Sequence, residues 1–386
     1  MKNNQWYIIF GEDWGRHSST GQFIAIEIAK TRNILWVNSL GIRVPGLNIT
    51  DIKRIITKLY QFANDVFFRK QTTAGIKTAI HVITPIAIPL LKYKFVRRIN
   101  SYIVAAFIKA KMQQFGITQP VVITAGLMGV DVIDKLEASA RVYYCADKYS
   151  EFPGQDKELV IRLESELLNK VDIVLATSMA LYSDLKKQHK NVNYVPHGVD
   201  YELFSNAITE SDKNISDELS KYNHPIIGFI GLIGPHLNYE IIKTISYEMR
   251  DASIIMIGPV EDGAEPPLGK NIYYLGKKER EQLPYYIREF DVCITPYISS
   301  DRIRYANPTK VREYLAAGCP TICTPQDEVN ATSDEVVFAE NGQAFVNSIK
   351  QISISNINRQ KISESVSNQT WHTQAERIIR IIESAA

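Results

Sequence analysis

The sequence predicts an α/β fold of two doubly wound domains, each a parallel sheet with helices on both faces. Two observations predict it: short apolar runs alternate with helical patterns along the whole chain, and the runs fall into two sets. Strands separated by amphipathic helices pair in parallel, because each crossover places a helix on a face of the sheet. The length of 386 residues also suits two domains of ordinary size.

Eleven apolar runs predict the strands. The first set is WYIIF from residue 6, NILWVN from 33, PVVITAG from 120, RVYYCAD from 141, DIVLATS from 172 and VNYVPHG from 192. The second set is IIGFIGLIG from 226, SIIMIGP from 253, NIYYLG from 271, DVCITPY from 291 and PTICTP from 320. The polar segment 206–225 between the sets lacks a strong period, as expected where one domain gives way to the next. We place the boundary near residue 200.

The stretch ANPTKVREYLAAGCP predicts a helix that begins near Thr309. Thr309 is the expected cap, Pro308 sets the entry, and Gly318 can take the left-handed conformation that stops a helix. Leu315 and Ala316 are expected to face inward.

Lys310 and Glu313 lie on the first turn of this helix, on one face. A lysine at this positive end of the helix dipole attracts an anion rather than stabilising the helix, so phosphate is the expected guest and Glu313 could accept hydroxyl groups. An ordinary surface helix with an ion pair between the two residues is the alternative. Their position after an apolar run favours binding, because ligands of doubly wound folds lie beyond the carboxyl ends of the strands.

Composition excludes several classes of protein. Hydrophobic residues at 45% and charged residues at 22% indicate a globular rather than a disordered chain. The four cysteines include no C-x-x-C pair, and the start lacks the pattern of a signal peptide. No apolar run reaches the roughly 20 residues of a membrane-spanning helix. We therefore expect a cytoplasmic protein with reduced thiols, no metal and no cofactor.

The net charge of +2 conceals an asymmetry. Residues 1–112 hold 17 lysines and arginines against 5 acidic residues, out of 44 and 42 in the chain. The segments 51–70 and 90–112 mix basic, aromatic and aliphatic residues at helical spacing, a pattern that suits an anionic membrane surface. Core-packed helices with solvated lysines are the alternative. No nucleic-acid module is visible, and no G-x-G-x-x-G turn suggests NAD.

Together these segments resemble the nucleotide-sugar glycosyltransferases of the GT-B fold, most closely the family 4 type of bacterial surface-polysaccharide synthesis. The motifs are DW at residue 13, YYCADKYSEF at 143, DIVLATSMALYSDL at 172, VPHGVDYELF at 195, GFIGLIG at 228 and PTKVREYLAAGCP at 308. The last is the most specific. The resemblance covers nearly the whole chain.

The resemblance implies a GT-B architecture, in which two Rossmann-like domains face a cleft. Residues 1–200 would bind the acceptor, residues 201–370 would bind the nucleotide sugar, and a helix over 371–386 would return to the first domain. The implied activity is transfer of a sugar from a nucleotide-diphosphate sugar, with retention of configuration, to a glycan or lipid-linked acceptor. The co-substrate replaces a cofactor, and the expected location is cytoplasmic, including the inner face of the cell membrane.

The resemblance also assigns a donor site. Glu313 would bind the ribose hydroxyls, while Lys310 and the N–H groups from Thr309 onward would hold the diphosphate, so that Lys310 favours departure of the leaving group. Loops at Gly258 and Gly276 would contact the base. The remaining expected donor residues are Gly231, Gly234, His236 and Asn307.

Two positions depart from the family pattern. Tyr305 stands where many relatives have a glutamate, and His236 stands in a loop where many have an arginine and a lysine. Arg302 or Arg304 could supply the missing charge, although each could equally be a solvated loop residue.

The acceptor site is expected on loops of the first domain. Trp14 could stack on a sugar and Arg16 could meet a phosphate, or Trp14 could be structural. Asp147 could act as a base, or cap the next helix. The expected residues are Asp13, Trp14, Gly15, Arg16, His17 and Asp147, and the expected catalytic residues are Asp147, Lys310 and Glu313. A nucleotide-binding support subunit without activity and a nucleotide-sugar epimerase remain alternatives.

Overall fold

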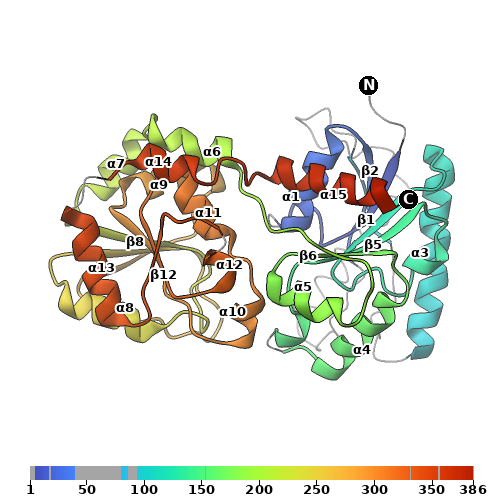
Figure 1. Ribbon diagram of the computed structural model, residues 1–386, viewed down its shortest axis with the longest axis horizontal. Helices are drawn as coiled ribbons and strands as arrows, with labels where there is room; N and C mark the ends of the chain where they lie inside the picture. The colour runs from blue at the N-terminus through green and yellow to red at the C-terminus, as the bar shows by residue number, and fades with distance from the viewer. Residues whose placement is uncertain are drawn as a thin grey trace. The chain divides into compact units, whose positions relative to one another are not determined.

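The computed structural model of the chain describes residues 5–16, 19–39, 80–85, 94–152, 154–330, 332–354 and 357–385. Two compact units make up the chain. One contains Met1–Pro196 and Gln374–Ala386, and the other contains His197–Thr373. Each is a sheet flanked by helices (Figure 1).

The sheet of the first unit has seven parallel strands in the order β3-β2-β1-β4-β5-β6-β7. Ile8, at the centre, lies opposite Leu35 on one neighbour and Val122 on the other. The strands are β1 Trp6–Phe10, β2 Asn33–Val37, β3 Ile80–Ile83, β4 Val121–Ala125, β5 Ala140–Cys145, β6 Ile173–Ala176 and β7 Val192–Tyr194.

The described helices of the first unit follow the alternation that the sequence predicts. They are α1 Thr20–Ala29, α3 Lys94–Phe115, η1 Ile133–Lys135, η2 Tyr149–Glu151, α4 Lys157–Leu168 and α5 Met179–Lys186. The last helix of the chain, α15 Trp371–Ala385, belongs to this unit from Gln374 onward. Its Glu383 forms an ion pair of 2.8 Å with Arg32, which follows α1.

The second unit contains a six-stranded parallel sheet in the order β10-β9-β8-β11-β12-β13. Its strands are β8 Ile226–Ile230, β9 Ser253–Ile257, β10 Ile272–Gly276, β11 Val292–Thr295, β12 Thr321–Cys323 and β13 Val336–Phe338. Its helices are α6 Tyr201–Ser205, η3 Asn206–Ile208, α7 Lys213–Leu219, α8 Tyr239–Glu248, η4 Arg280–Gln282, α9 Leu283–Glu289, α10 Asp301–Tyr305, α11 Thr309–Ala316, α12 Asp327–Asn330, α13 Gly342–Ile354 and α14 Arg359–Glu364.

Helices cover both faces of this second sheet. Successive side chains of a strand point to opposite faces, so β8 supplies both layers of the core. Ile227 and Phe229 pack into the layer with α8 and α13, while Ile226 and Ile230 pack into the layer with α9, α11 and α14. The doubly wound prediction is confirmed.

The strands agree with the sequence except at the sheet edges. All eleven predicted strands are present, and β3 and β13 were not predicted. Both are short edge strands. An apolar run of only three or four residues is too short to distinguish a strand from other structure by its pattern.

The polar segment 206–225 is not a domain transition. It folds within the second unit as η3 and α7, and the division between the units falls between Pro196 and His197. Asp212 caps α7 by accepting a hydrogen bond from the Asn214 N–H. The helix is too short to show a clear period.

Candidate functional site

Three glycines end adjacent strands at one edge of the second sheet. Gly231 follows β8, Gly258 follows β9, and Gly276 closes β10. The N–H of Gly231 donates to the Ile257 carbonyl, and the N–H of Gly258 donates to the Gly276 carbonyl, both at 2.8 Å. The backbone ladder therefore continues past the strands and aligns three loops at the carboxyl edge, where doubly wound folds bind ligands.

Close approach explains two of these glycines. A Cβ on Gly258, whose φ is +140°, would lie 1.9 Å from the carbonyl oxygen of Gly231. A Cβ on Gly231 would lie 2.0 Å from Cε of Lys310. The first glycine lets two loop backbones touch, and the second leaves room for the lysine side chain.

Tyr314 fixes helix α11 against this edge. Its buried hydroxyl accepts a hydrogen bond from the Ile230 N–H at 2.8 Å and donates one to the Ile230 carbonyl at 3.1 Å. Both bonds are to the last residue of β8. The start of α11 is therefore held beside Gly231.

The start of α11 differs from the prediction in one respect. Pro308, not Thr309, is the N-cap, and no side chain caps the helix. Thr309 is already the first helical residue, because Pro308 has the extended conformation of a cap residue. The first-turn N–H groups lack a side-chain acceptor, and proline has no side-chain oxygen to offer one. Gly318, with φ of +71°, ends the helix as predicted.

Lys310 extends along Gly231 from the first turn of α11. Among the described residues it makes no hydrogen bond or ion pair, and the surrounding atoms remove water from its ammonium. This desolvation lowers the pKa of Lys310, and the negative charge of Glu313 partly opposes the shift. A bound anion would stabilise the charged ammonium.

Glu313 does not pair with Lys310, which removes the alternative of an ordinary ion pair within the helix. Its Oε1 instead lies 3.2 Å from Nη1 of Arg280, a residue of η4 in the loop after β10. The Glu313 side chain is mostly buried, with 17% of its area exposed. Sequence reasoning missed Arg280, although it lies within the segment GKKERE that was placed after this strand.

His236 lies on the loop after β8. Burial, and then the charges of Arg302 and Lys310, lower the pKa of His236 to about 4, so the imidazole is neutral at pH 7. Its ring lies 5.8 Å from the ring of Tyr297. Arg302 is thus one of the cations near this loop, as the sequence allowed. On the same loop, a Cβ on Gly234 would lie 2.3 Å from Oε2 of Glu261.

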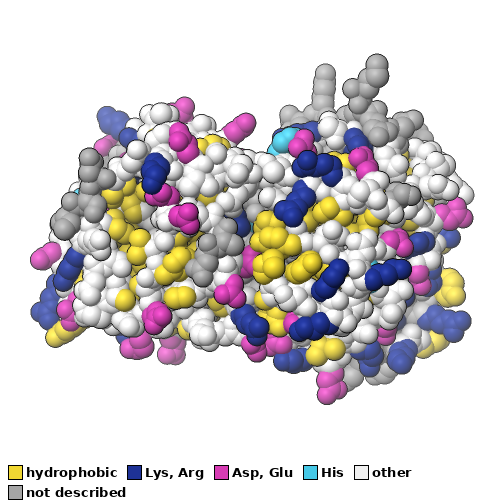
Figure 2. Space-filling model, viewed as in Figure 1, with side chains coloured by type: hydrophobic (Ala, Val, Ile, Leu, Met, Phe, Trp, Pro, Cys, Tyr) yellow, Lys and Arg dark blue, Asp and Glu magenta, His cyan; other side chains and the backbone are white. Residues whose placement is uncertain are grey.

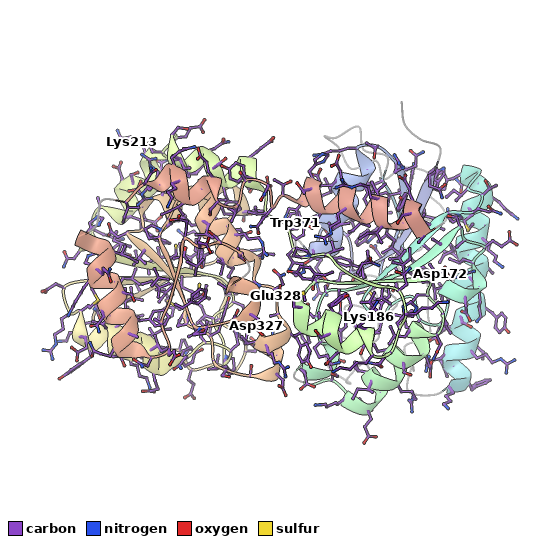
Figure 3. The ribbon with its side chains drawn as sticks, in the orientation of Figure 1. Asp172, Lys186, Lys213, Asp327, Glu328 and Trp371 are labelled. Atoms are coloured by element: carbon purple, nitrogen blue, oxygen red, sulfur yellow. The ribbon has the colours of Figure 1, made fainter. Side chains whose placement is uncertain are left out.

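Asn307 anchors the segment that leads into α11. Its side-chain amide donates to Glu328 at 2.9 Å and accepts from Arg312 at 2.6 Å. Its carbonyl accepts from Nδ1 of His197 at 2.8 Å, and the His197 ring lies 5.9 Å from Trp371. Figure 3 labels Glu328, on α12, and Trp371. The Asn307 side chain is thus engaged within the unit.

The loop after β1 carries the residues predicted for the acceptor. Trp14 packs edge-on against Trp36, with ring centroids 4.9 Å apart. The backbone N–H of Trp14 donates to the side-chain oxygen of Asn38. The Asp13 carboxylate accepts from Ser39, and Gly15 has φ of +75°. Arg16 is exposed, and His17 lies outside the described residues.

Asp147 follows β5, in the loop that leads into η2. Its carbonyl accepts a hydrogen bond from the Tyr149 N–H at 3.1 Å. Burial raises the pKa of Tyr149, and the charges of Asp147 and Glu12 raise it further. The loops after β1 and β5 therefore bring two acidic side chains near one buried phenol. The next α-helix, α4, is capped by Asp156.

Neither a metal cluster nor a membrane-spanning helix is found in the described part of the chain. No group of three or more histidine, cysteine and acidic side chains could hold a metal ion there. No helix there is long and apolar enough to cross a bilayer.

Residues 224–354 match the family described as glycosyl transferases group 1, and this range lies within the second unit. A teichuronic acid biosynthesis glycosyltransferase, TuaH of Bacillus subtilis, whose function is itself inferred, is 26% identical over 200 residues. The alignment covers 47% of this chain and 50% of the relative. The chain therefore matches about half the length of this curated relative.

Solved structures match over nearly the entire chain. Sucrose-phosphate synthase from Thermosynechococcus elongatus has a TM-score of 0.70 at 14% identity, and the match covers 99% of both chains. The chain therefore has the GT-B fold. HepE of Anabaena, solved with UDP, has a TM-score of 0.65 at 12% identity, covering 98% of this chain and 100% of HepE. At these low identities the matches show the fold alone, so the substrates must be argued from the site.

Proposed function

We propose that the chain is a glycosyltransferase that moves a sugar from a nucleotide-diphosphate sugar to a glycan or lipid-linked acceptor in surface-polysaccharide synthesis. The observation that carries the proposal is Lys310, an ammonium without an ion-pair partner among the described residues, beside the uncapped start of α11. A lysine and several backbone N–H groups converge there, as diphosphate binding requires.

The donor half of the reaction follows from this arrangement. Lys310 and the N–H groups from Thr309 onward would hold the diphosphate, and Glu313 would accept the ribose hydroxyls. Gly276 is exposed, and the loops that begin at Gly276 and after the buried Gly258 would contact a base. As the glycosidic bond breaks, negative charge grows on the diphosphate, and Lys310 stabilises it more than it stabilises the bound donor. The proposal is supported by two structural neighbours, forms of HepE solved with UDP and with UDP-glucose.

The acceptor half rests on the first unit. Arg16 would meet an acceptor phosphate, and Asp147 would take the proton of the attacking hydroxyl. We propose that transfer retains the anomeric configuration, as in the family that the sequence resembles.

We further propose that the protein acts at the inner face of the cell membrane. One face of α3 is exposed and apolar, with 72% of Phe95, 58% of Tyr102 and 47% of Ile103 accessible. Helix α3 contains five basic residues and no acidic one, and of these Arg97 is buried and paired with Asp131 and Glu166. In Figure 2, basic and hydrophobic side chains lie side by side along the right-hand edge, where Figure 1 places α3. The segment 51–70, which was also predicted to suit an anionic membrane surface, lies outside the described residues.

Nucleotide binding is tested by calorimetry with UDP, GDP, CDP and dTDP. Lys310→Ala and Glu313→Ala each remove a charge-assisted contact worth about 1.5–3 kcal/mol, or roughly 10- to 150-fold in affinity. Lys350→Ala, which removes an exposed lysine of α13, is the control and should bind like the wild type. Equal affinity in all proteins would refute the donor site.

Transfer is tested by NMR of the donor, alone and with lipid-linked glycans. A transferase releases nucleotide only when an acceptor is present, and the product anomer reports retention. Asp147→Asn should lower transfer strongly while donor affinity stays within about twofold. An epimerase would convert the donor without acceptor, and a support subunit would bind nucleotide without converting it; either result would overturn the proposal.

A further inference from the structure

Glu313 is held by a residue from a different loop. Arg280 follows the glycine that ends β10, and its guanidinium lies 3.2 Å from Oε1 of Glu313. Oε2 of Glu313 makes no hydrogen bond with any described residue. One carboxylate oxygen is thus engaged, and the other is available.

The position of Arg280 is itself fixed from three sides. The side chains and backbones of Glu279 and Gln282 form a capping box that sets the turn carrying Arg280. The guanidinium lies 5.5 Å from the ring centroid of Phe204, which is fully buried, and 3.8 Å from the Asp200 carboxylate. Only 23% of the Arg280 side chain is exposed. A guanidinium held on an aromatic face gives its partner a defined orientation.

We propose that Arg280 is a positioning residue that turns the free oxygen of Glu313 toward the hydroxyl groups of a ribose, and so makes the site selective for ribonucleotides. The inference rests on the proposed function. A carboxylate without this partner could rotate among several rotamers, and freezing it on binding would weaken the hydrogen bonds that it offers. A site built to bind hydroxyl groups rejects an analogue that lacks them, because its polar group is then left unpaired.

The test compares affinities for a nucleoside diphosphate and for its 2′,3′-dideoxy analogue, using UDP and dideoxy-UDP if uridine is the preferred base. The wild type should prefer the ribonucleotide at least tenfold. Arg280→Ala should weaken ribonucleotide binding about tenfold, leave the dideoxy compound within twofold, and so remove most of the preference. After Glu313→Ala, the additional change Arg280→Ala should have no further effect on either ligand.

Two further variants test whether the loss of preference comes from unfolding or from the loss of any positive charge. Arg280→Met retains an apolar stem over Phe204 and should show the same loss of preference. Arg250→Ala, which removes an arginine after α8 that contacts Tyr247, should behave like the wild type. Thermal denaturation reports the folding of each protein.

Each other outcome has a definite meaning. An equal loss for both ligands in Arg280→Ala would overturn the inference, since the arginine would then act on the diphosphate. An unchanged preference would also overturn it and leave the proposed function standing. A wild type that binds no nucleoside diphosphate would overturn both.

Discussion

At the scale of single residues, the candidate site depends on glycines, because a Cβ atom at these positions would collide with neighbouring atoms. Gly231 and Gly258 are both close to other atoms, but their neighbours differ. A methyl group on Gly231 meets the flexible end of Lys310, whereas one on Gly258 meets the carbonyl oxygen of Gly231. A side chain can move aside, and a hydrogen-bonded loop backbone cannot do so without strain.

The two alanine variants should therefore differ: one should lose mainly stability and the other mainly nucleotide affinity. Gly258→Ala should reduce the free energy of unfolding by about 1–3 kcal/mol, as overpacked sites do. Gly231→Ala should lose less stability but displace the Lys310 ammonium and weaken nucleotide binding about tenfold. Denaturant melts and calorimetry on both proteins measure this. A Gly231→Ala protein that binds nucleotide normally would contradict the packing of Lys310 against Gly231.

His197 gives a prediction about pH. Burial, and then the charge of Arg312, lower its pKa to about 4, against 6.5 for an ordinary histidine. The unfolded chain therefore binds the proton first, and stability falls as the pH drops from about 6.5 toward 4. The loss from this residue is about 3 kcal/mol. In His197→Asn, where an amide can still donate to Asn307, the loss over this pH range should be smaller by about that amount. Parallel pH profiles in urea would show that the pKa is not lowered.

At the scale of elements, α11 is held in place by one contact from within the helix and one from the residues just before it. Tyr314 binds it to the end of β8, and Asn307 links its Arg312 to Glu328 of α12. Arg312 and Glu328 are each only 2% exposed. Buried charges are expensive unless hydrogen-bonded, so this network holds the helix start in one place.

Asn307→Ala should therefore destabilise the protein well beyond the loss of one side chain. Each buried charge loses a hydrogen bond, and the expected reduction in unfolding free energy is about 2–4 kcal/mol. Asn347→Ala, on the exposed side of α13, is the matched control and should change stability by less than about 0.5 kcal/mol. Similar melting curves for the two variants would show that the network does not hold α11.

At the scale of the whole molecule, the chain separates its charges. Residues 1–112 are strongly basic, and the remainder is acidic. Because α3 lies in the basic part and exposes aromatic and aliphatic side chains, we expect the first unit to carry the membrane-binding surface.

This predicts salt-dependent binding to vesicles that contain anionic lipid. The wild type should float with anionic liposomes at low salt and be largely released at high salt. Phe95→Ser with Arg98→Glu should reduce the bound fraction severalfold, because one change removes an apolar contact and the other reverses a charge. Lys213→Glu, an exposed position of the second unit labelled in Figure 3, should bind as the wild type does. Equal binding to neutral and anionic vesicles would exclude electrostatic attraction to the lipid. Self-association of the protein through α3 is the alternative, and sedimentation would detect it.

The sequence by itself determined the features that depend on near neighbours. Apolar runs predicted eleven strands, because a strand buried on both faces needs apolar residues throughout. Gly318 predicted the end of α11, because a left-handed turn favours glycine. The first-turn position of Lys310 followed from helical spacing, whereas Glu313, also predicted there, lies beyond the first turn of α11. The edge strands β3 and β13, and the short helix α7, are too short to show a clear pattern and were missed.

Only the tertiary structure decided which distant groups meet. Glu313 pairs with Arg280 rather than with Lys310, Lys310 packs on Gly231, and Asn307 is engaged by Arg312 and Glu328. The contacts of Glu313 with Arg280 and of Lys310 with Gly231 are not visible in the spacing of the residues, because strand order brings their segments together. Parallel strands place the ends of segments far apart in the chain along one edge, so the chemistry of the site is fixed by packing and not by local sequence.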